Sequence, residues 1–117
     1  FNTFADFLKS GADKHSTLTG IELAKKNITE FHKKQLRSGF EINEGNGIVA
    51  GQKVTPIEKV GIYVPGGTAS YPSTVLMNAI PAKIAGVKEL VMVTPPSASG
   101  KVNPVILAAA KIAGALS

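Results

Sequence analysis

The chain has 117 residues, a formal net charge of +5 and no cysteine. This length predicts one domain with a modest core, and the lack of cysteine excludes disulfides, thiolate nucleophiles and cysteine-ligated metals. No apolar run reaches the roughly 20 residues that span a bilayer, and residues 1–15 lack the pattern of a signal peptide. We therefore expect a cytoplasmic protein that does not act at a membrane.

The excess of positive charge raises the question of nucleic-acid binding. The basic residues are concentrated in one predicted helical segment with glutamates among them, which is typical of a solvated helix face with some paired charges. No aromatic side chains alternate with them, as a base-stacking surface requires. The pattern therefore favours a protein without a nucleic-acid function. The charged residues of this segment are Glu22, Lys25, Lys26, Glu30, Lys33, Lys34 and Arg37.

The N-terminal part of the chain predicts two helices. A short helix is expected over residues 3–9, and a longer one over residues 19–39. Thr19 is the predicted N-cap of the longer helix, Glu22 completes a capping box, and Gly39 ends the helix. The apolar side chains that follow the helical period, and that we expect on its buried face, are Ile21, Ala24, Ile28, Phe31 and Leu36.

A hairpin is predicted next. Residues 40–54 alternate apolar and polar side chains on both sides of Gly45-Asn46-Gly47. Those three residues accept the positive φ angles that a tight turn needs. Gly51 is expected to mark a β-bulge in the second strand.

The second half of the chain alternates strands and helices. Residues 59–64 (KVGIYV) and 89–94 (ELVMVT) are almost wholly apolar, as in strands that are buried on both faces. A helix over residues 73–85, bent by Pro81 and ended by Gly86, is predicted between them. The last predicted helix, over residues 104–113, is capped by Asn103 and closed by Gly114. The fold class is thus α/β, with a βαβα unit of parallel strands after the N-terminal helices and hairpin.

Two parallel strands cannot cover both faces of their own sheet. We therefore expect a piece of a longer α/β protein, with helices and a hairpin in residues 1–58 and the βαβα unit in residues 59–117, truncated after residue 117. The alternative is a complete small α/β domain to whose sheet the hairpin contributes further strands.

The candidate binding residues surround the turn after the first apolar strand. Pro65, Gly66 and Gly67 form a glycine turn where a ligand can approach the backbone, and the next helix N-terminus offers free N–H groups to a phosphate. The stretch is neither G-x-G-x-x-G nor a phosphate loop, so the motif by itself favours a plain structural turn. Tyr63 ends the strand where ligands of open α/β sheets bind; it either contacts a ligand or is a partly buried tyrosine with a local hydroxyl partner.

Other polar residues are weaker candidates. Ser73 or Thr74 is predicted as a helix N-cap and not as a nucleophile. The two histidines are His15, in a predicted polar loop, and His32, on the charged helix. Neither has a carboxylate partner for a Ser-His-Asp arrangement or the spacing of a metal site, so we expect both at the surface.

A long stretch of the sequence closely resembles histidinol dehydrogenases. The segment PIEKVGIYVPGGTASYPSTVLMNAIPAKIAGVKELVMVTPP (residues 56–96) carries the resemblance, and ELAKKNITEFHKKQL (22–36) and GQKVTP (51–56) match the same family in the same order. The similarity covers roughly residues 20–117.

The resemblance implies an NAD-dependent, zinc-containing oxidoreductase that converts L-histidinol to L-histidine through an aldehyde-level intermediate. It also implies a homodimer of intertwined subunits, a polypeptide considerably longer than this chain, and incomplete Rossmann-like nucleotide-binding units. The fragment alone should be inactive. The alternative function is a stand-alone nucleotide-binding or interaction module without catalysis.

By position, Tyr63 matches a tyrosine of the family that contacts NAD. Pro65, Gly66 and Gly67 form the adjoining turn and are assigned a weaker role beside the cofactor. The family's catalytic Glu-His pair, its zinc ligands and its main histidinol contacts lie outside these 117 residues, so no catalytic or metal residue is assigned here. His15 and His32 do not match them.

Overall fold

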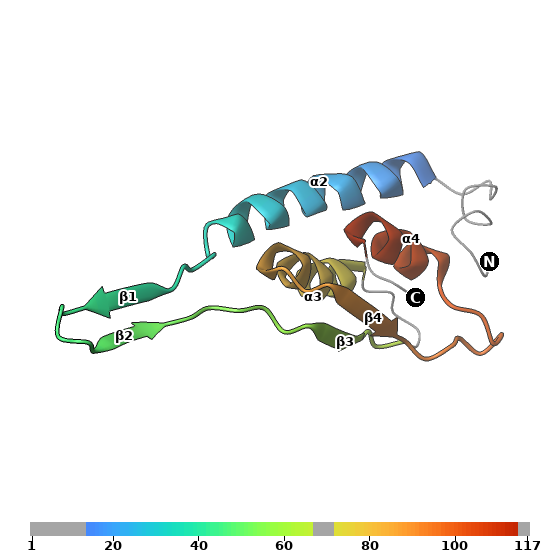
Figure 1. The fold of residues 1–117 in the computed structure, drawn as a ribbon. Coiled ribbons are helices and arrows are strands. Elements are labelled where there is room, and N and C mark those ends of the chain that lie inside the picture. Colours follow the sequence, from blue (N-terminus) through green and yellow to red (C-terminus); the bar gives the residue numbers. More distant parts are fainter. Residues whose placement is uncertain (1–13, 67–71, 115–117) are drawn as a thin grey trace.

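A computed structural model of the protein describes residues 14–66 and 72–114 (Figure 1). The short helix expected over residues 3–9 lies outside the described residues. The described elements are α2 (Lys14–Lys33), β1 (Phe40–Asn43), β2 (Val49–Gln52), β3 (Lys59–Tyr63), α3 (Pro72–Ala85), β4 (Glu89–Val93) and α4 (Pro104–Ala113).

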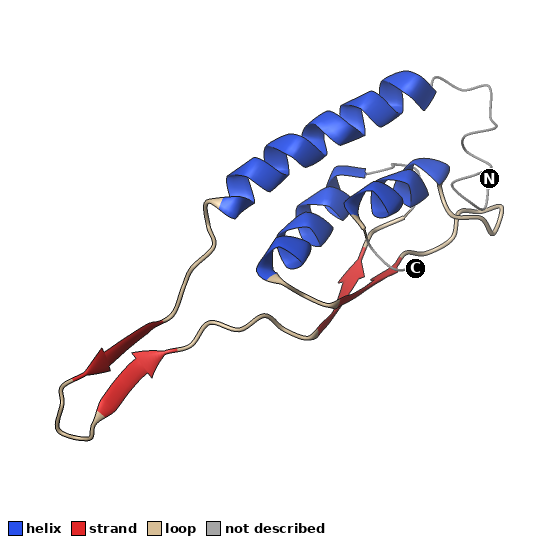
Figure 2. Cartoon of the chain, turned by 45° about the horizontal axis from the view of Figure 1, so that its top comes forward, coloured by secondary structure: helices blue, strands red, loops and turns tan. Residues whose placement is uncertain are grey.

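The C-terminal half forms the predicted βαβα unit. Strands β3 and β4 pair in parallel, in a register that runs from Lys59 opposite Glu89 to Tyr63 opposite Val93. Helix α3 connects the two strands, and α4 follows β4. Both helices lie on the same side of the strand pair, and α2 packs over them (Figures 1 and 2). The α/β fold class and the parallel strands are confirmed.

The sheet is buried on one face only. Leu90 is completely buried beneath the helices, whereas Val91, the next residue of β4, is 40% exposed. Within this chain the two strands are covered on one face only, as expected for two parallel strands alone, because every described helix packs on one side of the sheet. The exposed face carries Tyr63, Val91 and Val93, with Gly61 among them and no atom within 4 Å of its missing Cβ.

Helix α2 differs from its prediction at both ends. It begins at Lys14, so Thr19 is inside the helix and cannot be its N-cap, and His15 lies in the helix instead of a loop. Residues 14–18 contain no Gly or Pro, and extending an existing helix gains a hydrogen bond per residue. The helix ends at Lys33, before Gly39, where two tighter i→i−3 bonds close its last turn.

The buried face of α2 is only partly as expected. Ile21 is buried, and Ala24 and Ile28 pack against the core beside α3 and α4. The next position along this stripe is His32, which is half-buried, so Phe31 points away and is exposed. Leu36 lies past the end of the helix and is exposed as well.

The hairpin forms around the predicted turn. Strands β1 and β2 are antiparallel, and Gly45 and Gly47 have φ angles of 77° and 84°. The Asn43 side chain accepts a hydrogen bond from the Gly45 N–H at 2.9 Å, and the Asn46 side chain accepts one from the Ile48 N–H at 3.1 Å. These two Asx turns add local support to the positive φ angles of the glycines.

The predicted bulge at Gly51 is absent. Gly51 pairs with Glu41 in an unbroken register. A Cβ at Gly51 would collide with the backbone oxygen of Phe40, so close approach of the two strands explains this glycine.

The hairpin projects away from the helices (Figures 1 and 2). It forms a separate two-stranded sheet, and residues 33–59 are all exposed. The alternative in which the hairpin adds strands to the β3–β4 sheet was therefore wrong. The resulting shape is elongated: the radius of gyration is 18.6 Å, against about 13 Å for a compact chain of this length.

The helix ends of the βαβα unit follow the sequence in most places. Helix α3 begins at Pro72, so Ser73 and Thr74 lie in its first turn and are not its N-cap, because Pro is favoured at the first helical position. Gly86 follows the helix with φ 99°, as predicted. Pro81 lies inside α3, and the bend expected there stays a prediction.

The ends of α4 are as predicted. The Asn103 side chain accepts a hydrogen bond from the Val105 N–H at 2.8 Å, Pro104 is the first helical residue, and Gly114 has φ 81°. The cap satisfies an N–H of the first turn, and the left-handed glycine satisfies carbonyls of the last turn.

Replacing Leu90 tests the one-sided core. Leu90→Ala removes a fully buried side chain and should lower the free energy of unfolding by about 2–5 kcal/mol. Val91→Ala changes the adjacent residue on the exposed face and should cost about 0.5 kcal/mol. Urea unfolding of the chain measures both, and equal losses would contradict a sheet that is buried on one face.

Two glycines of helical segments should respond to alanine in opposite directions. Gly20→Ala should stabilise the chain by about 0.5–1 kcal/mol, because Gly20 lies inside α2 with nothing within 4 Å of the new methyl. Gly114→Ala should destabilise it by about 1 kcal/mol, because an alanine must adopt φ 81° there. Thermal unfolding compares the two variants, and a loss of stability in Gly20→Ala would contradict the helical conformation at that residue.

Candidate functional site

The candidate site lies at the carboxyl ends of β3 and β4. Tyr63 is the last residue of β3, and it is 63% exposed on the sheet face that the helices leave open. Its partner in the parallel register is Val93, which is also exposed. Within the described part of the chain, the Tyr63 hydroxyl has no hydrogen-bond partner. The ring is therefore not the partly buried, locally bonded tyrosine of the alternative interpretation.

The backbone that follows Tyr63 is anchored firmly. Val64 is completely buried, and its N–H donates to the Val93 carbonyl at 2.9 Å, which extends the parallel ladder past the end of β3. Pro65 and Gly66 come next and are exposed. Gly67, the other predicted turn residue, lies outside the described residues.

Gly66 lies against the segment that leaves β4. A Cβ added at Gly66 would lie 2.8 Å from Pro95 Cγ and 3.0 Å from the Pro95 carbonyl oxygen. Real Cβ atoms essentially never make contacts as short as 2.8 Å, so a side chain at this residue would displace one of the two segments. The space that glycine leaves open is thus filled by Pro95, and not held free for a ligand.

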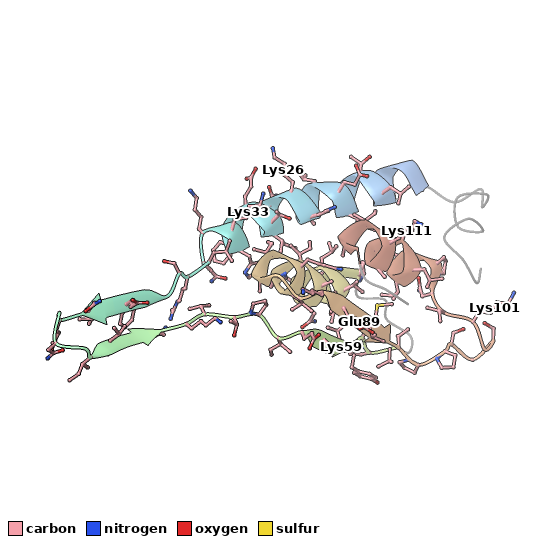
Figure 3. All side chains as sticks on the ribbon, in the orientation of Figure 1. Lys26, Lys33, Lys59, Glu89, Lys101 and Lys111 are labelled. Atoms are coloured by element: carbon pink, nitrogen blue, oxygen red, sulfur yellow. The ribbon has the colours of Figure 1, made fainter. Side chains whose placement is uncertain are left out.

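The acidic residue Glu89 lies at the other end of the sheet. It is the first residue of β4 and forms an ion pair with Lys59, with 3.0 Å between Nζ and Oε2 (Figure 3). Both side chains are substantially exposed, so the pair contributes under about 1 kcal/mol. Glu89 therefore lies at the amino end of its strand, away from the carboxyl end where the acidic ribose ligand of a dinucleotide site is found.

Lys25, Lys26 and Lys33 of α2 are exposed, as expected. Lys26 and Lys33 extend from the outer surface of the helix (Figure 3). The paired charges predicted for this helix are not found: among the described side chains, no ion pair lies within α2.

A pocket that the sequence did not predict lies where α2 ends above α3. It has a volume of about 390 Å³, and its lining includes His32, Arg37, Pro56 and Pro81. The Nδ1 atom of His32 lies 2.6 Å from Oε1 of Gln35. The lining comes from three segments that are distant in the sequence, so no local motif could have revealed it.

No described group of side chains resembles a metal centre. Within residues 14–66 and 72–114, no three His, Cys, Asp or Glu side chains lie close enough together to hold an ion. Among the same residues, no helix is long and apolar enough to cross a membrane.

Comparison with known proteins places these features in a family. The family model described as histidinol dehydrogenase matches residues 9–117. Histidinol dehydrogenase of Streptococcus mutans is 60% identical over 97 residues, which are 83% of this chain and 22% of that protein. The Lactiplantibacillus plantarum protein of the same name is 62% identical over 92 residues, which are 79% of this chain and 21% of that protein.

A solved structure supports the same relationship. The crystal structure of histidinol dehydrogenase from Elizabethkingia anophelis matches with a TM-score of 0.82 and 38% identity, over 96% of this chain and 25% of that one. This chain spans about a fifth of the length of the two curated relatives described above. The chain belongs to the histidinol dehydrogenase family.

Proposed function

We propose that this chain is a segment of an enzyme of histidine biosynthesis that oxidises L-histidinol to L-histidine with NAD and zinc. Its membership of the histidinol dehydrogenase family supports the reaction. The structural observation that carries the proposal is Tyr63, which lies exposed at the carboxyl end of a parallel strand, where ligands of open α/β sheets bind. The complete enzyme is proposed to be a cytoplasmic homodimer.

Tyr63 is the proposed NAD contact of this segment. Its ring offers a flat apolar surface for stacking, and its hydroxyl, which has no hydrogen-bond partner among the described residues, would bond a ribose or an amide. Pro65, Gly66 and Gly67 would border the cofactor. When bound, NAD would accept the hydride that leaves the substrate carbon. The residues of this chain would hold and orient the NAD molecule.

The described residues do not fit zinc. No group of three or more potential ligands occurs among them, and we place the proposed zinc ligands and the acid–base residues in the remainder of the polypeptide. The exposed Tyr63 ring also fits a second candidate function, a nucleotide-binding or interaction module without catalysis.

Substitution of Tyr63 tests the cofactor contact in the complete polypeptide that carries this chain. Tyr63→Ala should weaken NAD binding about tenfold, because it removes about 0.5–1.5 kcal/mol of ring contact and a hydrogen bond of similar size. Tyr63→Phe should lose only the contribution of the hydroxyl hydrogen bond to the NAD affinity. Calorimetric titration with NAD measures both variants.

Met77→Ala provides the control for this titration. Met77 is exposed like Tyr63, but it belongs to α3, on the opposite side of the sheet. Equal NAD affinity in Tyr63→Ala and in the unsubstituted protein would argue against the proposed contact.

The two candidate functions differ in turnover. The 117-residue chain alone should produce no NADH from histidinol, because its described residues supply no metal site and no acid–base pair. The complete polypeptide should produce NADH if the enzyme proposal is right, and should bind NAD without turnover if the module proposal is right. NADH absorbance distinguishes these results, and turnover by the 117-residue chain would contradict the assignment of the chemistry to the rest of the protein.

A further inference from the structure

The segments that leave β3 and β4 touch each other beside Tyr63. The Val64 N–H to Val93 carbonyl bond holds their first residues together at 2.9 Å. Two residues further along each segment, Pro95 fills the space next to the Gly66 Cα, with its ring and its carbonyl both within 3.0 Å of where a Cβ would be. The cross-strand ladder is thus continued by a steric contact after its hydrogen bonds end.

Pro95 is well suited to fix its neighbour in place. Its ring locks its own φ angle and keeps the preceding residue, Thr94, extended, so the segment has little freedom to rotate away from Gly66. An ordinary flexible side chain would move aside for an added methyl group, whereas the proline ring and backbone oxygen would force a backbone shift.

We propose that Pro95 is a positioning residue of the cofactor site. Its contact with Gly66 sets the backbone path of Pro65 and Gly66 after Tyr63, and Gly66 is glycine because Pro95 occupies its side-chain space. The effect on NAD rests on the proposed function, since Tyr63 and this turn are there assigned to the cofactor. The proposal gives Gly66 an indirect role, in contrast to a glycine that lets the cofactor approach the backbone.

A double-substitution experiment separates the two roles of Gly66. In the complete polypeptide, Gly66→Ala should weaken NAD binding about tenfold, since small displacements of binding groups are costly. Pro95→Ala should weaken it about two- to threefold. The double variant should bind NAD as well as Pro95→Ala alone, because loss of the ring removes the 2.8 Å contact with Cγ and frees the backbone of residue 95 to move its oxygen away from the methyl group.

The neighbouring proline provides the matched control. The three atoms nearest to a Cβ at Gly66 all belong to Pro95, so Gly66→Ala combined with Pro96→Ala should show no recovery. Calorimetric NAD titration and thermal unfolding are measured on every variant. The melting temperature should show the same recovery pattern as the NAD affinity, because relief of the clash acts on the fold as well.

The outcomes are distinct. A double variant as weak in NAD binding as Gly66→Ala would overturn the proposal and favour direct approach of the cofactor to Gly66. Recovery in melting temperature with NAD affinity unchanged throughout would show a purely structural contact and overturn the positioning role. Absence of NAD binding by the unsubstituted protein would instead overturn the proposed function, and is recognised before any variant is compared.

Discussion

The burial of one face of the β3–β4 pair is the constraint on which the rest of the structure depends. Val64 and Leu90 are completely buried under the helices, and successive residues of a strand point to opposite faces. This burial fixes the register, because a slip by one residue would expose the entire apolar set. The fixed register brings the ends of both strands together and places Gly66 beside Pro95.

The same alternation divides structural from functional residues along β3. Ile62 and Val64 point into the core, while Tyr63 between them points to the open face. The core residues therefore set the position of Tyr63 from the opposite face of the sheet. A residue that contacts a cofactor from the end of such a strand is held in place by the packed core on the other face of the sheet. A binding group needs this support.

The sequence predicted those features that depend on local chemistry. The Asn46 turn, the Asn103 cap and the parallel strands were all predictable, because each depends on residues close in sequence or on composition. The start of α2 was not predictable. Thr19 satisfies the rules for an N-cap, but the helix extends past it toward the N-terminus. The contact between Gly66 and Pro95 was out of reach as well, because it depends on strand register. Which face of the sheet stays open was not predictable, because both faces are apolar and composition does not reveal where a covering layer lies.

The projecting hairpin is expected to unfold independently of the rest of the chain. None of the residues of β1 and β2 is buried, so the hairpin adds nothing to the core. A two-stranded hairpin alone is at best marginally stable in water, and its turn and ladder hydrogen bonds must hold it. The hairpin can therefore open and close on its own while the helices and the β3–β4 sheet stay folded. Protection of the hairpin amides from hydrogen exchange then reports a local equilibrium. Protection of the Leu90 amide reports the unfolding of the helices and the β3–β4 sheet.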